Sequence, residues 1–167
     1  MKSGTREKRP KFSVTHQDES MIKLVRETDH KTLAVWAIDC AGRVLPSFEE
    51  KYPDDPRPRN AIEACRAWIN TGVFKMADIR GAALAAHAAA REVGEDTAAR
   101  SAARAAGQEV ATAHVPTHSL GAANYALQAV WRSTEPSEAD ATVARERDWQ
   151  YHHLLVLRER SASEKKG

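Results

Sequence analysis

Alanine dominates the middle of this chain. Between Ala77 and Ala129, 20 of 53 residues are alanine. Alanine has the highest helix propensity of all residues, and its small side chain lets neighbouring helices approach closely. No stretch of useful length alternates apolar and polar residues as a half-buried strand would. The sequence therefore predicts an all-α fold, in which thin, closely packed helices take the place of a thick aromatic core.

Apolar residues recur at steps of three and four along most of the chain, which is the spacing of one helix face. We expect about six helices, joined by short links, that pack as antiparallel neighbours in one compact array. Their predicted bounds are 30–51, 58–70, 74–93, 96–114, 117–132 and 136–160.

The ends of several predicted helices are marked by residues with special backbone preferences. Asp29 and Asp96 are good N-caps. Gly72 and Gly94 follow periodic segments and are expected to end them. Pro46 lies inside the first predicted helix, where it would either kink the helix or restart it at a first-turn position.

Length and charge indicate one globular domain with polar ends. The 167 residues carry a net charge of +2, and residues 1–11 alone contribute +4, so the rest sums to −2. We expect a largely flexible basic arm over 1–27, a single helical domain over 28–160 and a flexible tail over 161–167. The apolar cluster of Met21, Ile22, Leu24 and Val25 within the arm is expected to form only a lead-in turn.

Composition and sequence pattern argue against several classes of binding partner and cellular location. The body of the chain is not a basic platform for specific nucleic-acid binding. No apolar run approaches the 18 residues of a membrane span, and no secretory signal follows the basic start, so we expect a cytoplasmic protein without a membrane partner. Cys40 and Cys65 lie far apart without a CxxC pattern, and we expect two buried, reduced thiols.

Three histidines form the most suggestive group of chemical side chains. His87, His114 and His118 lie on apolar helix faces or at a helix junction, and three neutral imidazoles could bind a divalent metal ion. The alternative, which we favour, is that they bond backbone groups and hold no metal or other cofactor. We expect them at one end of the array near Trp36 and Asp39, with His114 beside His118 and His87 roughly 16 Å away along the helix axis.

The usual signatures of catalysis are missing, since the chain contains no GxxxxGK[ST], GxGxxG, GxSxG or HExxH motif. Asp39 and Arg43 lie four residues apart in the first predicted helix, either as a surface pair or as a charged rim beside Trp36 on a binding surface. The candidate binding residues are Trp36, Asp39, Arg43, His114, His118 and Tyr125, and no catalytic residue is assigned.

One bacterial family matches several stretches of the sequence. LAVWAIDCAGRVLPSFEEKYPDDPRPRNAIEACRAW (33–68) resembles the small all-helical immunity proteins of polymorphic toxin systems, the immunity-five-like group. AALAAHAAARE (82–92) and AAGQEVATAHVPTHSLGAANYALQAV (105–130) are similar to the rest of that pattern, so the resemblance covers about 28–151. It implies a single helical domain that neutralises a cognate protein toxin.

Three hypotheses of different classes follow from the sequence. In the first, the chain is a non-catalytic immunity protein that covers the surface of its toxin. In the second, it is a metal-dependent hydrolase that uses His87, His114 and His118, with Asp39 or a nearby carboxylate as base. In the third, it is a structural module that forms a homodimer through its alanine-rich faces, which could equally pack inside the monomer.

Overall fold

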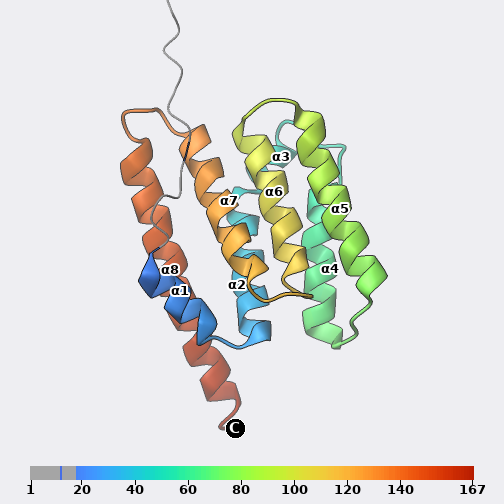
Figure 1. Ribbon diagram of the computed structural model, residues 1–167, viewed down its shortest axis with the longest axis vertical. Helices are drawn as coiled ribbons and strands as arrows, with labels where there is room; N and C mark the ends of the chain where they lie inside the picture. The colour runs from blue at the N-terminus through green and yellow to red at the C-terminus, as the bar shows by residue number, and fades with distance from the viewer. Residues whose placement is uncertain (1–11, 13–17) are drawn as a thin grey trace, which may run out of the picture.

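The computed structural model describes residue 12 and residues 18–167, and over these residues the chain is α-helical without any strand (Figure 1). Seven helices have eight residues or more, and an eighth is a single turn. They are α1 (Glu19–Arg26), α2 (His30–Val44), α3 (Pro46–Glu49), α4 (Arg57–Thr71), α5 (Met76–Val93), α6 (Ala98–Ala111), α7 (His118–Ser133) and α8 (Ala139–Glu164). The predicted all-α fold is confirmed. The expected number of six is exceeded by the short helices α1 and α3.

The helices form two layers around α6. In Figure 1, α5, α6 and α7 lie side by side in front of α2 and α4, while α8 and α1 flank one side. Ser101 of α6 bonds Gln128 of α7, and Gln108 bonds His118, so α6 and α7 run antiparallel. Helix α6 packs against α2, α3, α4, α5 and α7 and is therefore the hub of the array.

Small side chains allow α6 to have so many neighbours. Its buried residues are Ala99, Ser101, Ala102, Ala103, Ala105, Ala106, Gly107, Glu109 and Val110. Apart from Glu109 and Val110 they are alanine, serine or glycine, which let helix backbones approach closely. The alanine-rich sequence thus explains how five helices can surround one.

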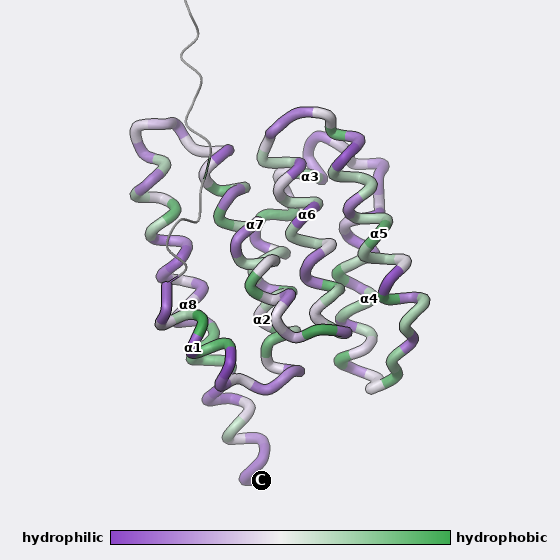
Figure 2. The backbone as a smooth tube through the Cα atoms, viewed as in Figure 1, coloured by the Kyte–Doolittle hydropathy of each residue, from purple (hydrophilic) through white to green (hydrophobic). Residues whose placement is uncertain are grey.

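The larger core residues belong to the rear layer. Trp36, Leu45 and Phe48 are almost completely buried on α2, α3 and the residue that joins them. Cys40 and Cys65 are buried free thiols, as predicted. Figure 2 shows that apolar and polar residues are interspersed along most helices. None of the described helices is long and apolar enough to span a membrane.

Most of the predicted helix ends are confirmed. The Asp29 carboxylate accepts a hydrogen bond from the Thr32 amide at 3.0 Å and caps α2. Pro46 restarts the helix, since α2 ends at Val44 and α3 begins at the proline. Gly72 and Gly94 end α4 and α5 with φ of +69° and +72°, a left-handed conformation that favours glycine.

Two predicted boundaries are wrong. Thr97, rather than Asp96, caps α6, because the Asp96 carboxylate is engaged by Arg100 and by Arg132 of α7. Helix α8 begins at Ala139 instead of residue 136 and continues to Glu164, into the segment for which the sequence predicted a flexible tail.

The apolar cluster in the predicted N-terminal arm is a helix rather than a turn. Asp18 caps α1 by accepting a hydrogen bond from the Ser20 amide at 3.0 Å, and Met21, Leu24 and Val25 are buried in the core. The described helices therefore begin at Glu19, before residue 28. The rest of the predicted arm, residues 1–11 and 13–17, lies outside the described residues.

The alanine-rich faces of α5 and α6 pack against each other inside the chain. Ala86, Ala89 and Ala90 of α5 are buried, as are the alanines of α6. Of the two alternatives left by the sequence, packing within the monomer is the one observed. These buried alanines are not available to a second copy.

A larger residue in α6 tests whether the packing of the array depends on the small side chains of this helix. We expect Ala106→Leu, at a position with no exposed surface, to lower the free energy of unfolding by about 1–3 kcal/mol, because extra methylenes in a packed core force side chains and backbone to move. Urea denaturation followed by circular dichroism measures the change. The same substitution at exposed Ala67 on α4 is the control, expected within about 0.5 kcal/mol of wild type. Equal stabilities for the two variants would contradict the role assigned to α6.

Candidate functional site

Two of the predicted binding residues belong to a polar network that joins α2 to α8. The Arg43 guanidinium donates to both carboxylate oxygens of Glu146, at 2.6 and 2.9 Å. One turn away along α2, Asp39 and His153 lie 2.7 Å apart between Oδ2 and Nε2. Trp149 lies between the pairs, with the Arg43 Cζ atom 3.8 Å from its ring centroid and the His153 ring stacked at 4.6 Å. We call these five residues the α2–α8 ladder.

Each charge of the α2–α8 ladder already has a partner within the chain. The hydrogen bond to Glu146 is the main cause that raises the pKa of Arg43. A guanidinium over an indole adds a cation–π contact to the ion pair. The predicted pair of Asp39 and Arg43 therefore holds α8 on α2, and a partner would have to displace these contacts to use either residue.

The structure corrects the predicted position of Trp36. Its side chain is fully buried, and its Nε1–H donates to the Gln150 carbonyl at 2.9 Å. Gln150 in turn donates from Nε2 to the Ala123 carbonyl at 3.0 Å, so α2, α8 and α7 are linked in series. A buried tryptophan with a satisfied N–H stabilises this junction and offers no surface. Tyr125, also predicted to bind, is half-buried on α7 and packs against the core.

His87 and His118 approach α6 from opposite sides. His87 of α5 lies with its Nδ1 3.1 Å from a guanidinium nitrogen of Arg104. Its ring covers Gly107, where a Cβ would come within 2.6 Å of Nε2. His118 of α7 lies with its Nδ1 2.8 Å from the Gln108 amide oxygen and must carry its proton there, since that oxygen can only accept. We call His87, Arg104, Gln108 and His118 the α6 polar face.

The surroundings of His87 on the α6 polar face favour its neutral form. Burial is the largest cause that lowers the pKa of His87, and electrostatic interactions with Arg104, Arg91 and His118 lower it further. A neutral Nδ1 can accept the hydrogen bond that Arg104 donates. No carboxylate among the described residues lies within ion-pair distance of this imidazole, so nothing there orients it as the base of a catalytic pair.

The predicted arrangement of the three histidines is wrong. His114 is exposed and stacks on Phe74 of the α4–α5 loop at 6.1 Å, while His87 and His118 interact across α6. Over the part of the chain that the structure describes, no three His, Cys, Asp or Glu side chains are grouped to hold a metal ion. Nor do the histidines contact Trp36 or Asp39, whose partners lie on α8.

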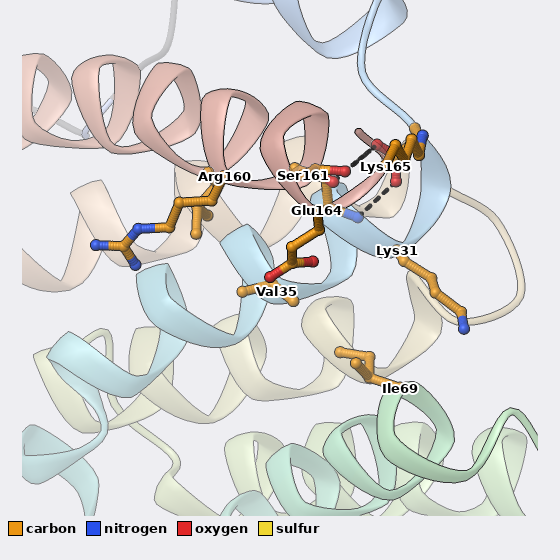
Figure 3. A pocket seen from close by; sticks show the side chains of 10 residues that line it. Lys31, Val35, Ile69, Arg160, Ser161, Glu164 and Lys165 are labelled. Carbon is orange, nitrogen blue, oxygen red and sulfur yellow. Dashed lines mark hydrogen bonds between the residues drawn. The ribbon is translucent and has the colours of Figure 1, made fainter. Parts of the chain in front are cut away.

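A hollow of about 420 Å³ lies between the start of α2 and the end of α8 (Figure 3). Val35 and Ile69 lie on its apolar side, and Lys31 and Arg160 extend outward from its rim. Ser161 donates to the Asp29 carboxylate across 3.4 Å and ties the end of α8 to the cap of α2. Charges of both signs line the rim, and the Asp29 carboxylate is already engaged by the Thr32 amide and by Ser161.

Sequence reasoning missed the most unusual titratable group in the chain. Glu109 of α6 is fully buried, and both its carboxyl oxygens lack a hydrogen-bond partner among the described residues. The thiol of Cys65, a weak donor, lies beside it. Burial raises the pKa of Glu109 well above its ordinary value, so the carboxyl is held in its neutral form. The spacing from Ala102, Ala105 and Ala106 places residue 109 on the inner face of α6, and this was the signal available.

Comparisons with known proteins give one match. A family model described as Imm-5 like putative immunity protein matches residues 23–157, from the middle of α1 into α8. No curated protein and no solved structure matches the chain.

The buried Glu109 carboxyl makes a prediction about pH and stability. Because its folded pKa is raised, its contribution is fully present below the pKa of the unfolded chain, about 4.3, and is lost as the pH rises through the folded pKa. Glu109→Gln removes this titration. We expect the variant to gain stability over wild type as the pH rises from 4 to 8, by up to about 1.4 kcal/mol per pH unit.

Chemical denaturation at a series of pH values measures this difference. Glu159→Gln at an exposed position on α8 is the matched control, expected to follow the wild-type pH profile. Identical pH profiles for Glu109→Gln and wild type would show that Glu109 does not titrate as described.

Proposed function

We propose that this chain, which belongs to the family of Imm-5 like putative immunity proteins, neutralises a protein toxin by binding to it and covering its surface. The observation that carries the proposal is the extent of the family match, 23–157, which includes all of α2 to α7. Nearly the whole helical array is therefore the family's domain. We further propose that the toxin belongs to a bacterial polymorphic toxin system and that neutralisation takes place in the cytoplasm.

The state of the polar side chains supports binding rather than chemistry. The α2–α8 ladder is internally paired, His118 is engaged with Gln108, and Glu109 has no exposed surface. An immunity protein that acts by occlusion requires a complementary surface and no reacting group. The hydrolase hypothesis requires three imidazoles on one ion, an arrangement that the positions of His87, His114 and His118 do not support.

Stoichiometry distinguishes occlusion from catalysis. We expect co-expression of the chain to restore growth to bacteria that express the toxin domain encoded by the neighbouring gene. With purified proteins, we expect toxin activity to fall linearly as the chain is added and to end near one equivalent per toxin. A toxin from an unrelated system is the control and is expected to remain active.

Two outcomes would contradict the proposal. Failure to protect cells from the neighbouring gene product would remove the toxin as partner. Full inactivation of the toxin by a small fraction of an equivalent would indicate an enzyme that modifies it.

A further inference from the structure

The outward face of α5 carries a continuous stripe of apolar and basic side chains. Met76, Arg80, Leu84, His87 and Arg91 follow one another at steps of four and three, the spacing of one helix face. We call these residues the α5 stripe. Met76 is 43% and Leu84 59% exposed, and both arginines are exposed. Helix α5 lies at the edge of the array, so that no further helix covers this side (Figure 1).

The loop before α5 extends the apolar part of the stripe. Val73 is 58% and Phe74 41% exposed, and the His114 ring stacks on Phe74. Figure 2 shows this loop as an apolar segment at the surface. Four of the six large hydrophobic residues that the described structure leaves exposed, namely Val73, Phe74, Met76 and Leu84, lie here. An apolar cluster that a soluble fold leaves in water is typical of an interaction surface.

The positive charge beside this cluster is not neutralised. Arg80 and Arg91 of the α5 stripe, and Arg104 next to His87, form no ion pair with any described residue. Other arginines of the neighbouring helices are paired, such as Arg57 with Asp55 and Glu92 and Arg100 with Asp96. Burial first, and then Arg104, Arg91 and His118, lower the pKa of His87, as expected for an imidazole beside unpaired arginines.

The acids of α5 lie on its other side. At 3.6 residues per turn, Asp78 and Glu92 are roughly 160° and 120° around the helix from the middle of the stripe. Glu92 confirms this direction, because its carboxylate pairs with Arg57 at the start of α4. The charges of α5 are thus segregated into a basic side that faces α6 and solvent and an acidic side that faces α4.

We infer that the α5 stripe, together with Val73 and Phe74, is the docking surface for an acidic protein surface that presents an apolar anchor. Leu84 lies between Arg80 and Arg91, so an apolar centre has a basic rim, the arrangement in which buried anchors supply affinity and charges supply steering. The identity of that partner as the toxin rests on the proposed function.

A protein fits this surface better than a nucleic acid. Two unpaired arginines about three turns apart on α5 and a third on α6 offer few phosphate contacts, while affinity for DNA grows with the number of such contacts. Leu84 and Met76 are aliphatic and provide no platform for stacked bases, and the Phe74 ring is already stacked on His114. Apolar anchors of this kind are matched by apolar side chains of another protein.

A titration of the full chain with defined probes tests the surface without the toxin. The probes are a 15-residue helical peptide of glutamate and leucine, the same peptide with lysine for glutamate, and a 15-base-pair DNA duplex. We expect the glutamate peptide to shift backbone amide resonances of residues 73–91 in 15N-labelled protein, and to do so more weakly as salt is raised. The lysine peptide and the duplex are expected to leave them unchanged at the same concentrations.

Single substitutions at the surface make the test specific. We expect Leu84→Ala and Arg91→Glu each to weaken the glutamate peptide about tenfold. Val156→Ala and Arg145→Glu, at exposed positions of α8, are the matched controls and are expected to bind like wild type. Circular dichroism checks that all four variants keep their helix content.

Several results would overturn the inference. These are the absence of glutamate-peptide binding at millimolar concentration, shifts confined to other helices, unchanged affinity of both stripe variants, and tighter binding of the DNA duplex. A toxin-neutralisation assay with wild type and the two stripe variants distinguishes failure of this inference from failure of the proposed function. If wild type and both stripe variants neutralise equally, the docking surface lies elsewhere while the immunity role stands. If wild type fails to neutralise, the immunity role falls and the titration still decides the stripe.

Discussion

Close packing around α6 is the constraint on which the rest of the structure depends. Five helices contact this one segment, which is possible only because its inward side chains are almost all alanine, serine or glycine. No single side chain of such a hub contributes much to its stability. Most of the stabilisation comes from many close van der Waals contacts at high packing density. The bulky residues, Trp36 and Phe48 among them, lie on α2 and α3, where the layer has room for them.

The small residues that let the helices approach closely also determine part of the surface of the molecule. At Gly107 the His87 ring lies where a Cβ would be, and at Gly121 the Gln108 side chain does the same. These two glycines bring α5 and α7 close to α6 and place an arginine, two histidines and an amide on one face. The basic side of α5 is next to this face, so the surface we assign to a partner is built on the hub. The buried Glu109 is the costly residue of the hub, because only the weak donor Cys65 lies beside its carboxyl and burial raises the pKa of that carboxyl well above its ordinary value.

The sequence predicted the helical fold well and the candidate site poorly, for a physical reason. Helix ends depend on local chemistry, and Asp29, Pro46, Gly72 and Gly94 act within one turn of themselves. Helix α1 was missed because a two-turn helix carries too few periodic residues to stand out, and its stability comes from burial of Met21, Leu24 and Val25. Side-chain partners depend on which faces meet. The spacing of Asp39 and Arg43 could not show that the partners of both residues lie on α8. The spacing of the histidines could not show that Gly107 leaves room for the His87 ring to lie over α6.

Native-state amide hydrogen exchange of the full chain tests the role of α6 most directly. Amides of residues 102–110 are predicted to exchange only through global unfolding, with a free energy equal to that from denaturation, while amides of α1 and of the last turn of α8 exchange through local opening at lower free energy. Exchange of residues 102–110 through local opening, at a free energy below that of α4 or α8, would contradict the description of α6 as the hub of this protein.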